Sequence, residues 1–267
     1  MKNYLFGFIG AGNMGGALAK AAAKNTKEIL ICDKDSEKAK SLADDLGCDV
    51  GDIVDVVKNC TYIFLGVKPQ MMADMLSSVS EELQSRDDVI LVSMAAGLSI
   101  DTIKKMAGKD FKVIRIMPNT PVSVGLGEIL YSKSENTTDE ELAKFIDIMK
   151  GAGALTKIDE SLMDAGCSVS GCGPAFVYMF IKSLAQGGAE CGIDYDTSLQ
   201  LAAQTVLGSA KLLIESGIDP DTLKQNVCSP GGSTIEGVKS LENSGLEDTV
   251  IKAVKSSYRR NIELGKQ

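Results

Sequence analysis

Two patterns of apolar and polar residues divide the chain into halves. In the first half, nearly continuous apolar runs alternate with stretches of helical periodicity, and the runs are YLFGFIG, EILIC, TYIFLGV, DVILVSM and FKVIRIM. The periodic stretches predict helices over residues 13–24, 36–46, 70–83 and 99–106. Strands that are apolar on both faces and alternate with helices indicate a parallel sheet covered on both sides.

A capping box and a short strand close the first half. Thr138 and Glu141 have the spacing of a capping box, which predicts a helix that starts there and continues through TDEELAKFIDIMK. The short run ALTKI predicts a further strand that ends near Ile158. Together these elements predict a doubly wound, Rossmann-type dinucleotide-binding domain over residues 1–158 of this α/β chain.

The second half, residues 159–267, shows helical periodicity and little else. Helices are predicted over residues 173–192, 196–217, 219–226, 233–243 and 246–264. One of them carries a broad apolar stripe that includes Leu199, Val206 and Leu213. We expect part of this stripe to be buried against a second subunit, which makes this half an all-helical oligomerisation domain. A self-contained bundle is the alternative.

The residues GAGNMG lie between the first predicted strand and the first predicted helix, and they match the pattern G-x-G-x-x-G. In this context Gly10 permits a tight turn, Gly12 lets a pyrophosphate approach the backbone, and Gly15 lets the helix pack closely on the strand. The anion would lie at the helix N-terminus, where backbone N–H groups lack partners. The pattern predicts a dinucleotide site; a tight turn without a ligand is the alternative.

Asp33 follows the second predicted strand, about twenty residues beyond the glycines, where a carboxylate accepts hydrogen bonds from the adenosine ribose. A carboxylate at this position favours NAD, because it would repel a 2′-phosphate. Lys34 comes next and would partly offset that repulsion. Alternatively, Asp33 and Asp35 simply form a turn ahead of the next helix.

Three further loops should lie at the same edge of the sheet, because ligands of such sheets bind outside the carboxyl ends of the strands. Lys68, followed by Pro69 at a helix start, is placed to contact a phosphate or the substrate. The small residues in VSMAAG leave room for a nicotinamide, and Asn119 in RIMPNTP brings a polar side chain to the edge. Polar loop residues and helix start signals explain each feature equally well.

Charge and composition narrow the range of partners. The formal net charge is −8, which repels phosphate backbones, so no nucleic-acid partner is expected. No apolar run approaches the ~18 residues needed to span a bilayer, and the N-terminus lacks the features of a signal peptide, so a cytoplasmic protein is expected. The seven cysteines contain no CxxC pair and are expected to be core residues rather than metal ligands.

The chain contains no histidine. Its absence excludes Ser-His-Asp and Cys-His nucleophiles, histidine-based metal sites, and dehydrogenases that use an imidazole as their acid or base. Any reaction that this protein catalyses therefore proceeds without the commonest proton carrier.

The helical half contains two similar stretches, SVSGCGPAF and VCSPGGSTIEG, which are predicted to be loops. Each combines hydroxyl residues, closely spaced glycines and a proline with the start of a helix. In the second stretch, Ser233 and Glu236 again have capping-box spacing. Backbone N–H groups at such a helix start bind a carboxylate, which contributes about 0.3–1 kcal/mol. Composition alone makes helix capping and ligand binding equally good explanations.

Five segments in this order and spacing resemble pyrroline-5-carboxylate reductase: GFIGAGNMG, FLGVKP, MPNTP, SGCGPAF and NVCSPGGSTIEGV. The resemblance covers essentially the whole chain. It implies reduction of the cyclic imine pyrroline-5-carboxylate to L-proline, the final step of proline biosynthesis, by hydride from NADPH or NADH. It also implies a helical domain that interlocks in a homodimer, often within a larger ring of dimers.

The resemblance assigns residues of this chain to two sites. Around the substrate carboxylate and ring nitrogen it implies Ser229, Gly231, Gly232, Ser233 and Thr234. Along the cofactor, the matching positions and their neighbours, together with the two residues after the second strand, are Gly10, Ala11, Gly12, Asn13, Met14, Asp33, Lys34, Val67, Lys68, Pro69, Ala95, Ala96 and Asn119. No metal is implied.

A cyclic imine as substrate would explain the missing histidine. A carbonyl reduction needs an acid to protonate a developing alkoxide, whereas an imine enters protonated or takes up its proton easily, and the iminium accepts the hydride. The protein then chiefly supplies orientation and carboxylate binding. Thr234 is the candidate catalytic residue, as the hydrogen-bonding partner of the nitrogen, although its hydroxyl is too weak an acid to act alone.

Two departures from the family pattern bear on the coenzyme. The family commonly has serine or arginine after the second strand, which suits NADPH, whereas this chain has Asp33 and Lys34. An asparagine that is often found before the third strand is replaced around Asp52 and Ile53. Both changes concern the coenzyme preference rather than the reaction, and Asp33 favours NADH.

Two other functions compete with this prediction. The β-hydroxyacid dehydrogenases share the glycine-rich opening and a helical second domain, but they need a lysine four residues past a Gly-x-Gly, where this chain has Val177. A nucleotide-sensing protein on the same fold would bind the dinucleotide without turnover, and it would leave the second glycine loop without a role.

Overall fold

The computed structural model describes residues 3–265, which form two compact units. The first unit takes in the chain up to Cys172 together with the stretch from Ser257 onward, and the helical unit is Gly173–Ser256. The helical unit is therefore an insertion in the first unit. The domain boundary predicted at residues 158 and 159 follows the last strand, whereas the compact units divide further along the chain.

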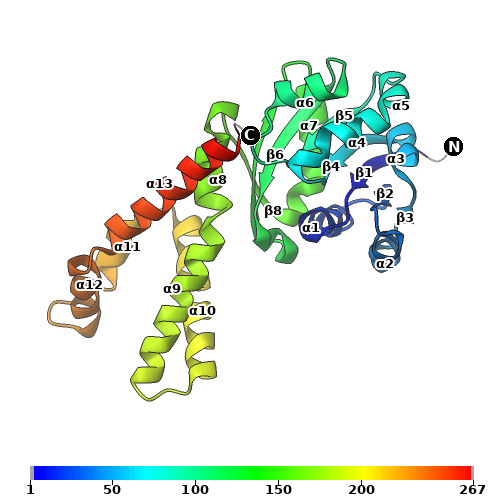
Figure 1. Ribbon diagram of the computed structural model, residues 1–267. Helices are drawn as coiled ribbons and strands as arrows, with labels where there is room; N and C mark the ends of the chain where they lie inside the picture. Colours follow the sequence, from blue (N-terminus) through cyan, green and yellow to red (C-terminus); the bar gives the residue numbers. More distant parts are fainter. Residues whose placement is uncertain (1–2, 266–267) are drawn as a thin grey trace. The chain divides into compact units, whose positions relative to one another are not determined.

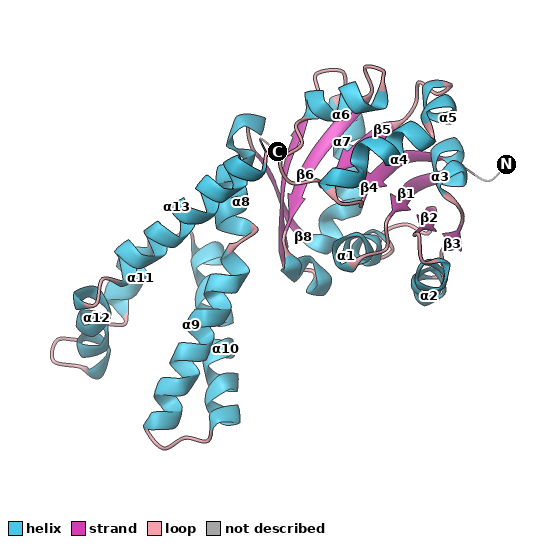
Figure 2. Cartoon of the chain, in the orientation of Figure 1, coloured by secondary structure: helices cyan, strands magenta, loops and turns pink. Residues whose placement is uncertain are grey.

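A sheet of eight strands, counted over the described residues, forms the centre of the first unit (Figures 1 and 2). The strands are β1 (Tyr4–Ile9), β2 (Ile29–Cys32), β3 (Asp49–Val50), β4 (Cys60–Leu65), β5 (Ile90–Ser93), β6 (Lys112–Pro118), β7 (Gly127–Lys133) and β8 (Gly153–Lys157). Their order is β3-β2-β1-β4-β5-β6-β7-β8, and every neighbouring pair is parallel except β6–β7. The order reverses between β1 and β4, and ligands of such sheets bind at this switch point.

Helices cover both faces of the sheet (Figure 2). One face carries α1 (Asn13–Ala22), α2 (Ser36–Leu46) and α7 (Asp139–Met149), and the other carries α3 (Ile53–Asn59), α4 (Met72–Ser78), α5 (Ser80–Gln84) and α6 (Ile100–Ala107). Next to the second group, α8 (Met163–Ser170) packs on β6 and β7 through Met117, Leu130 and Met163. Short 3-10 turns are η1 (Pro69–Met71), η2 (Thr120–Val124), η3 (Lys150–Ala152) and η4 (Glu160–Leu162).

An aromatic cluster holds the two central strands together. The rings of Phe8 and Phe64 stack with their centroids 4.2 Å apart, and Phe6 meets Tyr62 and Phe64 edge to face. Phe145 of α7 closes the cluster. Burial of each such ring contributes about 1.5–3 kcal/mol, so β1 and β4 form a rigid base for the turns that follow them.

The helical unit consists of α9 (Gly173–Glu190), α10 (Tyr195–Ser216), α11 (Pro220–Asn226), α12 (Ser233–Asn243) and most of α13 (Leu246–Leu264), which ends in the first unit. Helices α9 and α10 pack side by side (Figure 1). The buried Ser198 hydroxyl of α10 donates to the carbonyl oxygen of Ala185 in α9 at 2.7 Å. These two helices nevertheless expose the large apolar residues Val177, Tyr178, Met179, Phe180, Leu184, Tyr195, Leu199, Leu201, Leu207, Leu212, Leu213 and Ile214.

Most predicted elements are present. The five apolar runs and ALTKI contain strands, the helix predicted over residues 36–46 has the predicted bounds, and Thr138 and Glu141 form the predicted capping box. In the second half, α9 to α13 correspond to the predicted helices, and α12 and α13 have the predicted bounds.

Several local predictions were wrong or incomplete. The helix predicted over residues 70–83 is broken into η1, α4 and α5, with Val79 in a non-helical conformation between the last two. The sequence pattern also missed β3, α3 and β7, because the first two are very short and the run GEILYSK of β7 has few consecutive apolar residues.

The segment SVSGCG, predicted to be a loop, is the last turn of α8 followed by Gly171 and Cys172. Its serine hydroxyls bond within the helix, since Ser168 donates to the carbonyl oxygen of Asp164 at 2.8 Å and Ser170 donates to that of Gly166 at 3.2 Å. The resemblance between the two predicted glycine loops is therefore one of composition only.

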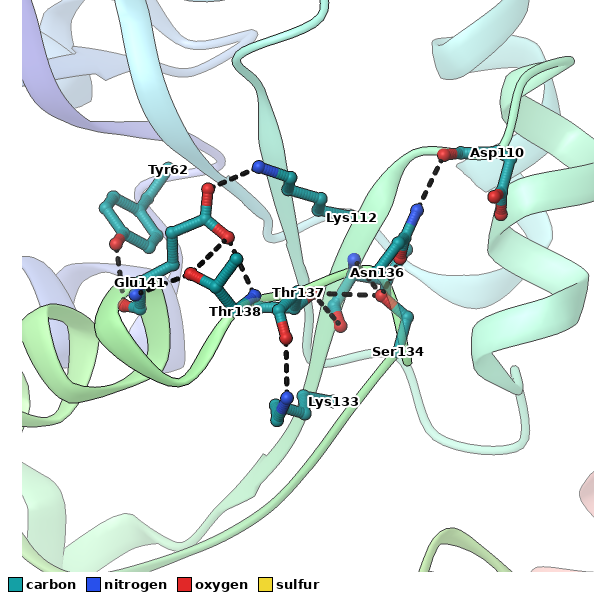
Figure 3. Close-up of polar contacts among 10 residues, drawn as sticks. Tyr62, Asp110, Lys112, Lys133, Ser134, Asn136, Thr137, Thr138 and Glu141 are labelled. Atoms are coloured by element: carbon teal, nitrogen blue, oxygen red, sulfur yellow. Dashed lines mark hydrogen bonds and ion pairs between the residues drawn. The ribbon is translucent and has the colours of Figure 1, made fainter.

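A polar network fixes the N-terminus of α7 (Figure 3). The N-cap hydroxyl of Thr138 accepts from the Glu141 N–H at 3.2 Å, and the Glu141 carboxylate accepts from the Thr138 N–H at 2.9 Å. The other carboxylate oxygen pairs with Lys112 of β6. The Tyr62 hydroxyl of β4 donates to the Glu141 carbonyl oxygen at 2.7 Å, and burial raises the pKa of Tyr62 to about 12, so this donor stays protonated.

Replacing Glu141 by alanine should lower the free energy of unfolding by about 1–2 kcal/mol at neutral pH, because the capping box and the Lys112 ion pair are both lost. Burial raises the pKa of Glu141, but the bonds from Lys112 and Thr138 outweigh it and leave the pKa below its usual value. The stabilisation is therefore complete above the usual pKa of about 4.3 and disappears as the pH falls through the lower folded-state value.

Urea unfolding at pH 7 and pH 3 measures this difference, with Glu140→Ala as the control, since Glu140 is an exposed acid in the same first turn. Equal destabilisation by the two substitutions would show that the network contributes nothing specific.

Candidate functional site

The first glycine turn joins β1 to α1 through backbone contacts that leave no room for side chains. Gly10 has a φ of +110°, and a Cβ there would lie 2.6 Å from the carbonyl oxygen of Gly66. A Cβ on Gly15 would lie 2.1 Å from the carbonyl oxygen of Gly10. The tight turn predicted for Gly10 and the close packing predicted for Gly15 are therefore present.

Gly12 has a different environment, because a Cβ there would meet no atom within 4 Å. Gly12 is the N-cap of α1, and no side chain of residues 3–265 caps this helix. Open space beside an uncapped helix N-terminus suits an anionic group. The predicted contact between Gly12 and a pyrophosphate is compatible with this geometry.

A cavity of about 880 Å³ lies where β1, β2 and β4 end, a volume within the usual range for ligand pockets. The predicted cofactor residues that line it are Gly10, Asp33, Lys34, Val67 and Lys68. A second cavity of about 420 Å³ is lined by the predicted residues Ala11, Gly12 and Asn13, among others.

Asp33 is held by two backbone N–H groups. Its Oδ2 accepts from the Ala11 N–H at 2.6 Å, and its Oδ1 accepts from the Asp35 N–H at 3.0 Å. Asp35 in turn caps α2 by accepting from the Lys38 N–H at 3.1 Å. The turn expected as the alternative role of Asp33 is thus present, and the same carboxylate also forms part of the cavity wall.

Carboxylates gather where β2 ends. Burial, followed by the negative charges of Asp33, Asp52 and Asp55, raises the pKa of the Cys32 thiol to about 11. Asp52 lines the cavity and forms a capping box with Asp55 at the start of α3. Lys34 also lines the cavity but is exposed. The end of the cavity near Asp33 and Asp52 therefore has a negative electrostatic environment, with Lys34 as a neighbouring cation.

Asn119 is bonded within the protein at both ends of its amide. Its Nδ2 donates to the Ser170 carbonyl oxygen at 3.0 Å, and its Oδ1 accepts from the Glu128 N–H at 2.8 Å. The side chain thereby connects the start of β7 to the end of α8. Contact between Asn119 and the cofactor stays a prediction, whereas the structure shows that the side chain links β7 to α8.

The remaining predicted cofactor residues follow β1, β4 and β5. Met14 is in the first turn of α1 and packs on the adjoining core, and Pro69 begins η1. In the loop after β5, Ala95 is buried and Ala96 is exposed. The predicted residues of the first unit thus lie in turns that follow strands of one sheet.

The second glycine loop, Ser229–Gly232, leads into α12 in the helical unit. Gly231 has a φ of +69°, and the Gly232 N–H donates to the carbonyl oxygen of Ser229 at 3.0 Å, which closes a tight turn. Gly232 is the N-cap of α12, and Ser229, Gly231, Ser233 and Thr234 are exposed.

The capping box predicted for Ser233 and Glu236 is wrong. Ser233 is the first residue of α12 rather than its N-cap, because the extended Gly232 already occupies that position. Glu236 accepts from Lys239 at 2.8 Å instead. Within the described residues, no side chain caps α12, so its first N–H groups are available to a ligand.

An ion pair between the buried Arg115 and the partly exposed Glu160 was missed in the sequence. Arg115 of β6 is only 5% exposed; its Nη1 donates to Glu160 Oε1 at 3.1 Å, and that oxygen also accepts from the Ile100 N–H at 2.7 Å. Arg115 interrupts the apolar run FKVIRIM, which is a usable signal for a paired charge. Its partner, far along the chain, carries no such signal.

Known proteins closely resemble this chain. A relative from Aquifex aeolicus, named pyrroline-5-carboxylate reductase, is 37% identical over 97% of this chain and 96% of its own length. The chain belongs to the pyrroline-5-carboxylate reductase family. The pyrroline-5-carboxylate reductase of Escherichia coli is 35% identical over 97% of this chain and 98% of its own length.

Solved structures of pyrroline-5-carboxylate reductases have the same fold. The Plasmodium falciparum protein, solved with NADP bound, is 31% identical with a TM-score of 0.86, over 99% of both chains. The Coxiella burnetii protein is 27% identical with a TM-score of 0.91, over 98% of this chain and 99% of its own.

Family models match both halves of this reductase-family chain. Residues 5–97 match the model described as NADP oxidoreductase coenzyme F420-dependent, and residues 160–264 match pyrroline-5-carboxylate reductase dimerisation. The predicted fold, a Rossmann-type domain followed by a helical oligomerisation domain, is confirmed. The apolar residues exposed on α9 and α10 agree with a homo-oligomer.

In the part of the chain that the structure describes, no helix is long and apolar enough to cross a bilayer.

Two single substitutions should separate packing from ligand binding in the first glycine turn. Gly15→Ala forces a methyl group into the Gly10 carbonyl and should destabilise the fold by about 1–3 kcal/mol. Gly12→Ala meets open space, so the melting temperature should stay within about 2 °C, while the affinity for NADH and NADPH falls at least about tenfold because the methyl group blocks a pyrophosphate.

Thermal unfolding and titration of coenzyme fluorescence measure the two effects. A Gly12→Ala variant that binds coenzyme as tightly as the unaltered chain would remove Gly12 from the site.

Proposed function

We propose that this protein reduces pyrroline-5-carboxylate to L-proline with hydride from NADH or NADPH. The observation that carries the proposal is full-length identity of 33–37% to proteins named for this activity. The two glycine turns add physical support, because each leaves a helix N-terminus without a side-chain cap among the described residues. One suits a dinucleotide pyrophosphate and the other suits a small carboxylate.

The coenzyme would bind at the carboxyl ends of β1, β2, β4 and β5. Gly12 offers open space beside α1, Asp33 and Lys34 would face the adenosine ribose, and Lys68 brings a cation to the cavity. The residues assigned to this site remain those predicted from the sequence, from Gly10 to Asn119. When bound, the reduced nicotinamide supplies the hydride.

The substrate carboxylate would bind at the N-terminus of α12. Ser229, Gly231, Gly232, Ser233 and Thr234 supply hydroxyls and N–H groups, and they are largely exposed in the single chain. A partly buried anion at such a terminus gains up to about 2 kcal/mol. We assign nucleotide binding to residues 1–158 and both dimerisation and substrate binding to residues 159–267.

Proton supply fits an imine substrate better than a carbonyl. The chain has no histidine, so the usual donor to an alkoxide is missing. An iminium carries its proton before hydride arrives, and the protein then has to orient the ring and bind its carboxylate. The Thr234 hydroxyl would hydrogen-bond to the ring nitrogen.

A homodimer formed through the helical unit would cover its exposed apolar face, which includes Tyr178, Met179 and Ile214 at 60%, 70% and 81% exposure. Large apolar side chains exposed together on a helix pair are typical of a protein–protein interface. Assembly of the dimers into a ring is the arrangement that the family resemblance implies.

The coenzyme preference that we propose is for NADH. Asp33 and Asp52 both line the cavity, and their charges, after burial, help to raise the pKa of Cys32. A 2′-phosphate near these carboxylates would be repelled by an amount on the order of 1 kcal/mol or more for each charge. Lys34 opposes this effect from the exposed side.

The activity is tested by mixing the protein with pyrroline-5-carboxylate and either coenzyme, and following coenzyme absorbance together with proline formation. Stoichiometric oxidation and proline production are expected. Tight coenzyme binding without turnover would favour the nucleotide-sensing alternative and overturn the reductase proposal.

Replacing Thr234 by alanine should reduce kcat/KM for pyrroline-5-carboxylate about ten- to a hundredfold while the KM for coenzyme stays unchanged, because only the contact with the nitrogen is lost. Thr234→Ser keeps the hydroxyl and should retain most of the activity. An alanine variant with full kcat/KM would exclude Thr234 from the mechanism.

Removing the carboxylates should shift the coenzyme preference. Asp33→Ser and Asp52→Asn should each raise kcat/KM for NADPH relative to NADH by about tenfold, since a repulsive charge is removed. Lys34→Gln should act in the opposite direction and weaken NADPH alone. Steady-state rates with both coenzymes measure the ratio, and a preference unchanged by all three variants would contradict this assignment.

A further inference from the structure

The loop between β5 and α6, Met94–Ser99, contains two of the predicted cofactor residues, Ala95 and Ala96. Its turning point is Gly97, with a φ of +77°, which a residue with a side chain rarely adopts. The Leu98 N–H donates to the Ala95 carbonyl oxygen at 3.4 Å, a long bond that contributes little rigidity. The loop therefore depends on its neighbours for a fixed conformation.

One neighbour is Gly265, the residue that directly follows α13. A Cβ on Gly97 would lie 2.9 Å from the Cα and 3.2 Å from the nitrogen of Gly265, so the two backbones touch without an intervening side chain. A Cβ on Gly265 would likewise lie 3.5 Å from the Cα and the carbonyl oxygen of Gly97. Both residues belong to the first unit.

The end of α13 is itself anchored on α8. Asn261 Nδ2 donates to the carbonyl oxygen of Asp164 at 3.1 Å and to the hydroxyl of the fully buried Ser168 at 3.2 Å. Helix α8 lies tightly on the sheet, since a Cβ on Gly166 would be 2.5 Å from a methyl group of Leu130. Gly265 therefore contacts the loop from a position that is fixed by the packing of α8 on the sheet.

The far end of the loop is held by the Arg115–Glu160 ion pair. Glu160 Oε1 accepts from the N–H of Ile100, the first residue of α6, and is fixed by Arg115. The β5–α6 loop is therefore held at Gly97 by Gly265, directly after α13, and at Ile100 by Glu160. Both contacting residues, Gly265 and Glu160, lie in segments that follow the last strand, β8.

We propose that Asn261–Gly265, here named the C-terminal anchor, is a positioning element for the coenzyme. By packing on Gly97, the anchor fixes the β5–α6 loop in the shape that receives the nicotinamide end of the coenzyme. The inference rests on the proposed function, because it assumes that Ala95 and Ala96 border the coenzyme. The anchor touches neither the substrate nor the reacting atoms in this scheme.

The test combines substitution at Gly97 with shortening of the chain. Gly97→Ala in the full-length protein should raise the coenzyme KM about tenfold, with the KM for pyrroline-5-carboxylate within about twofold at saturating coenzyme. A chain ending at Glu263, which lacks Leu264 to Gln267, should show a smaller rise in the coenzyme KM. A chain ending at Gly265, which lacks only Lys266 and Gln267, should behave as the unshortened chain.

The two changes should not be additive. In the chain ending at Glu263, a methyl group at position 97 has no Gly265 to strike, so Gly97→Ala should raise the coenzyme KM at least about threefold less than in the full-length chain. Equal effects of Gly97→Ala in both lengths would overturn the inference.

Gly108→Ala is the matched control for backbone strain. Gly108 has a φ of +75°, nearly that of Gly97, but a Cβ there meets only the flexible amide of Gln84 at 3.0 Å. Gly108→Ala should lower the melting temperature about as much as Gly97→Ala does, and it should leave the coenzyme KM unchanged. An equal rise in the coenzyme KM for Gly108→Ala would assign the Gly97 effect to general strain and overturn the inference.

Coenzyme titration by fluorescence separates this inference from the proposed function. An unaltered protein that binds neither NADH nor NADPH would overturn the coenzyme site and the anchor together. If the unaltered protein binds coenzyme normally and the effects of Gly97→Ala and of the truncation at Glu263 are additive, only the proposed role of the C-terminal anchor would be overturned.

Discussion

The backbone contact at the carboxyl end of β1 is the constraint on which the proposed coenzyme site depends. Gly10, Gly15 and Gly66 bring a turn, a helix and a neighbouring strand so close that no side chain fits between them. The aromatic cluster beneath holds β1 and β4 in place, and the Ala11–Asp33 hydrogen bond ties the end of β2 to the same turn. The α1 N-terminus, at Gly12 and Asn13, therefore borders a cavity from a fixed position.

The two units differ in how far they bury their apolar side chains and cap their helices. The first unit buries large cores on both faces of its sheet, whereas among the described residues α9 and α10 bury fully only Ala185, Ser198 and Ala202 and leave most of their large apolar side chains in contact with solvent. The helical unit also contains α12, which begins without a side-chain cap among the described residues. Both features suit a structure completed by something outside the single chain, a second subunit in one case and a carboxylate in the other.

Much of this architecture could be predicted from the sequence, because periodicity reports which faces are buried. The central strands and the amphipathic helices are long enough for that signal, whereas β3 and α3 are too short to carry it. Gly10 and Gly15 were predictable because a pattern with a known mechanism contains them. The capping box at Ser233 was wrong because spacing alone cannot tell an N-cap from the first helical residue, and here the extended Gly232 decides. Contacts such as Arg115–Glu160 and Gly97–Gly265 join distant segments, so no local pattern contains them.

The insertion of the helical unit into the first unit has a consequence for the order of events during synthesis. Domains generally fold as units, with N-terminal segments first as the chain leaves the ribosome. Here the sheet can form early, but the last residues of α13 belong to the same unit and are made after the whole helical unit. The Rossmann-type fold therefore has one loop without its support until the C-terminal anchor has been synthesised.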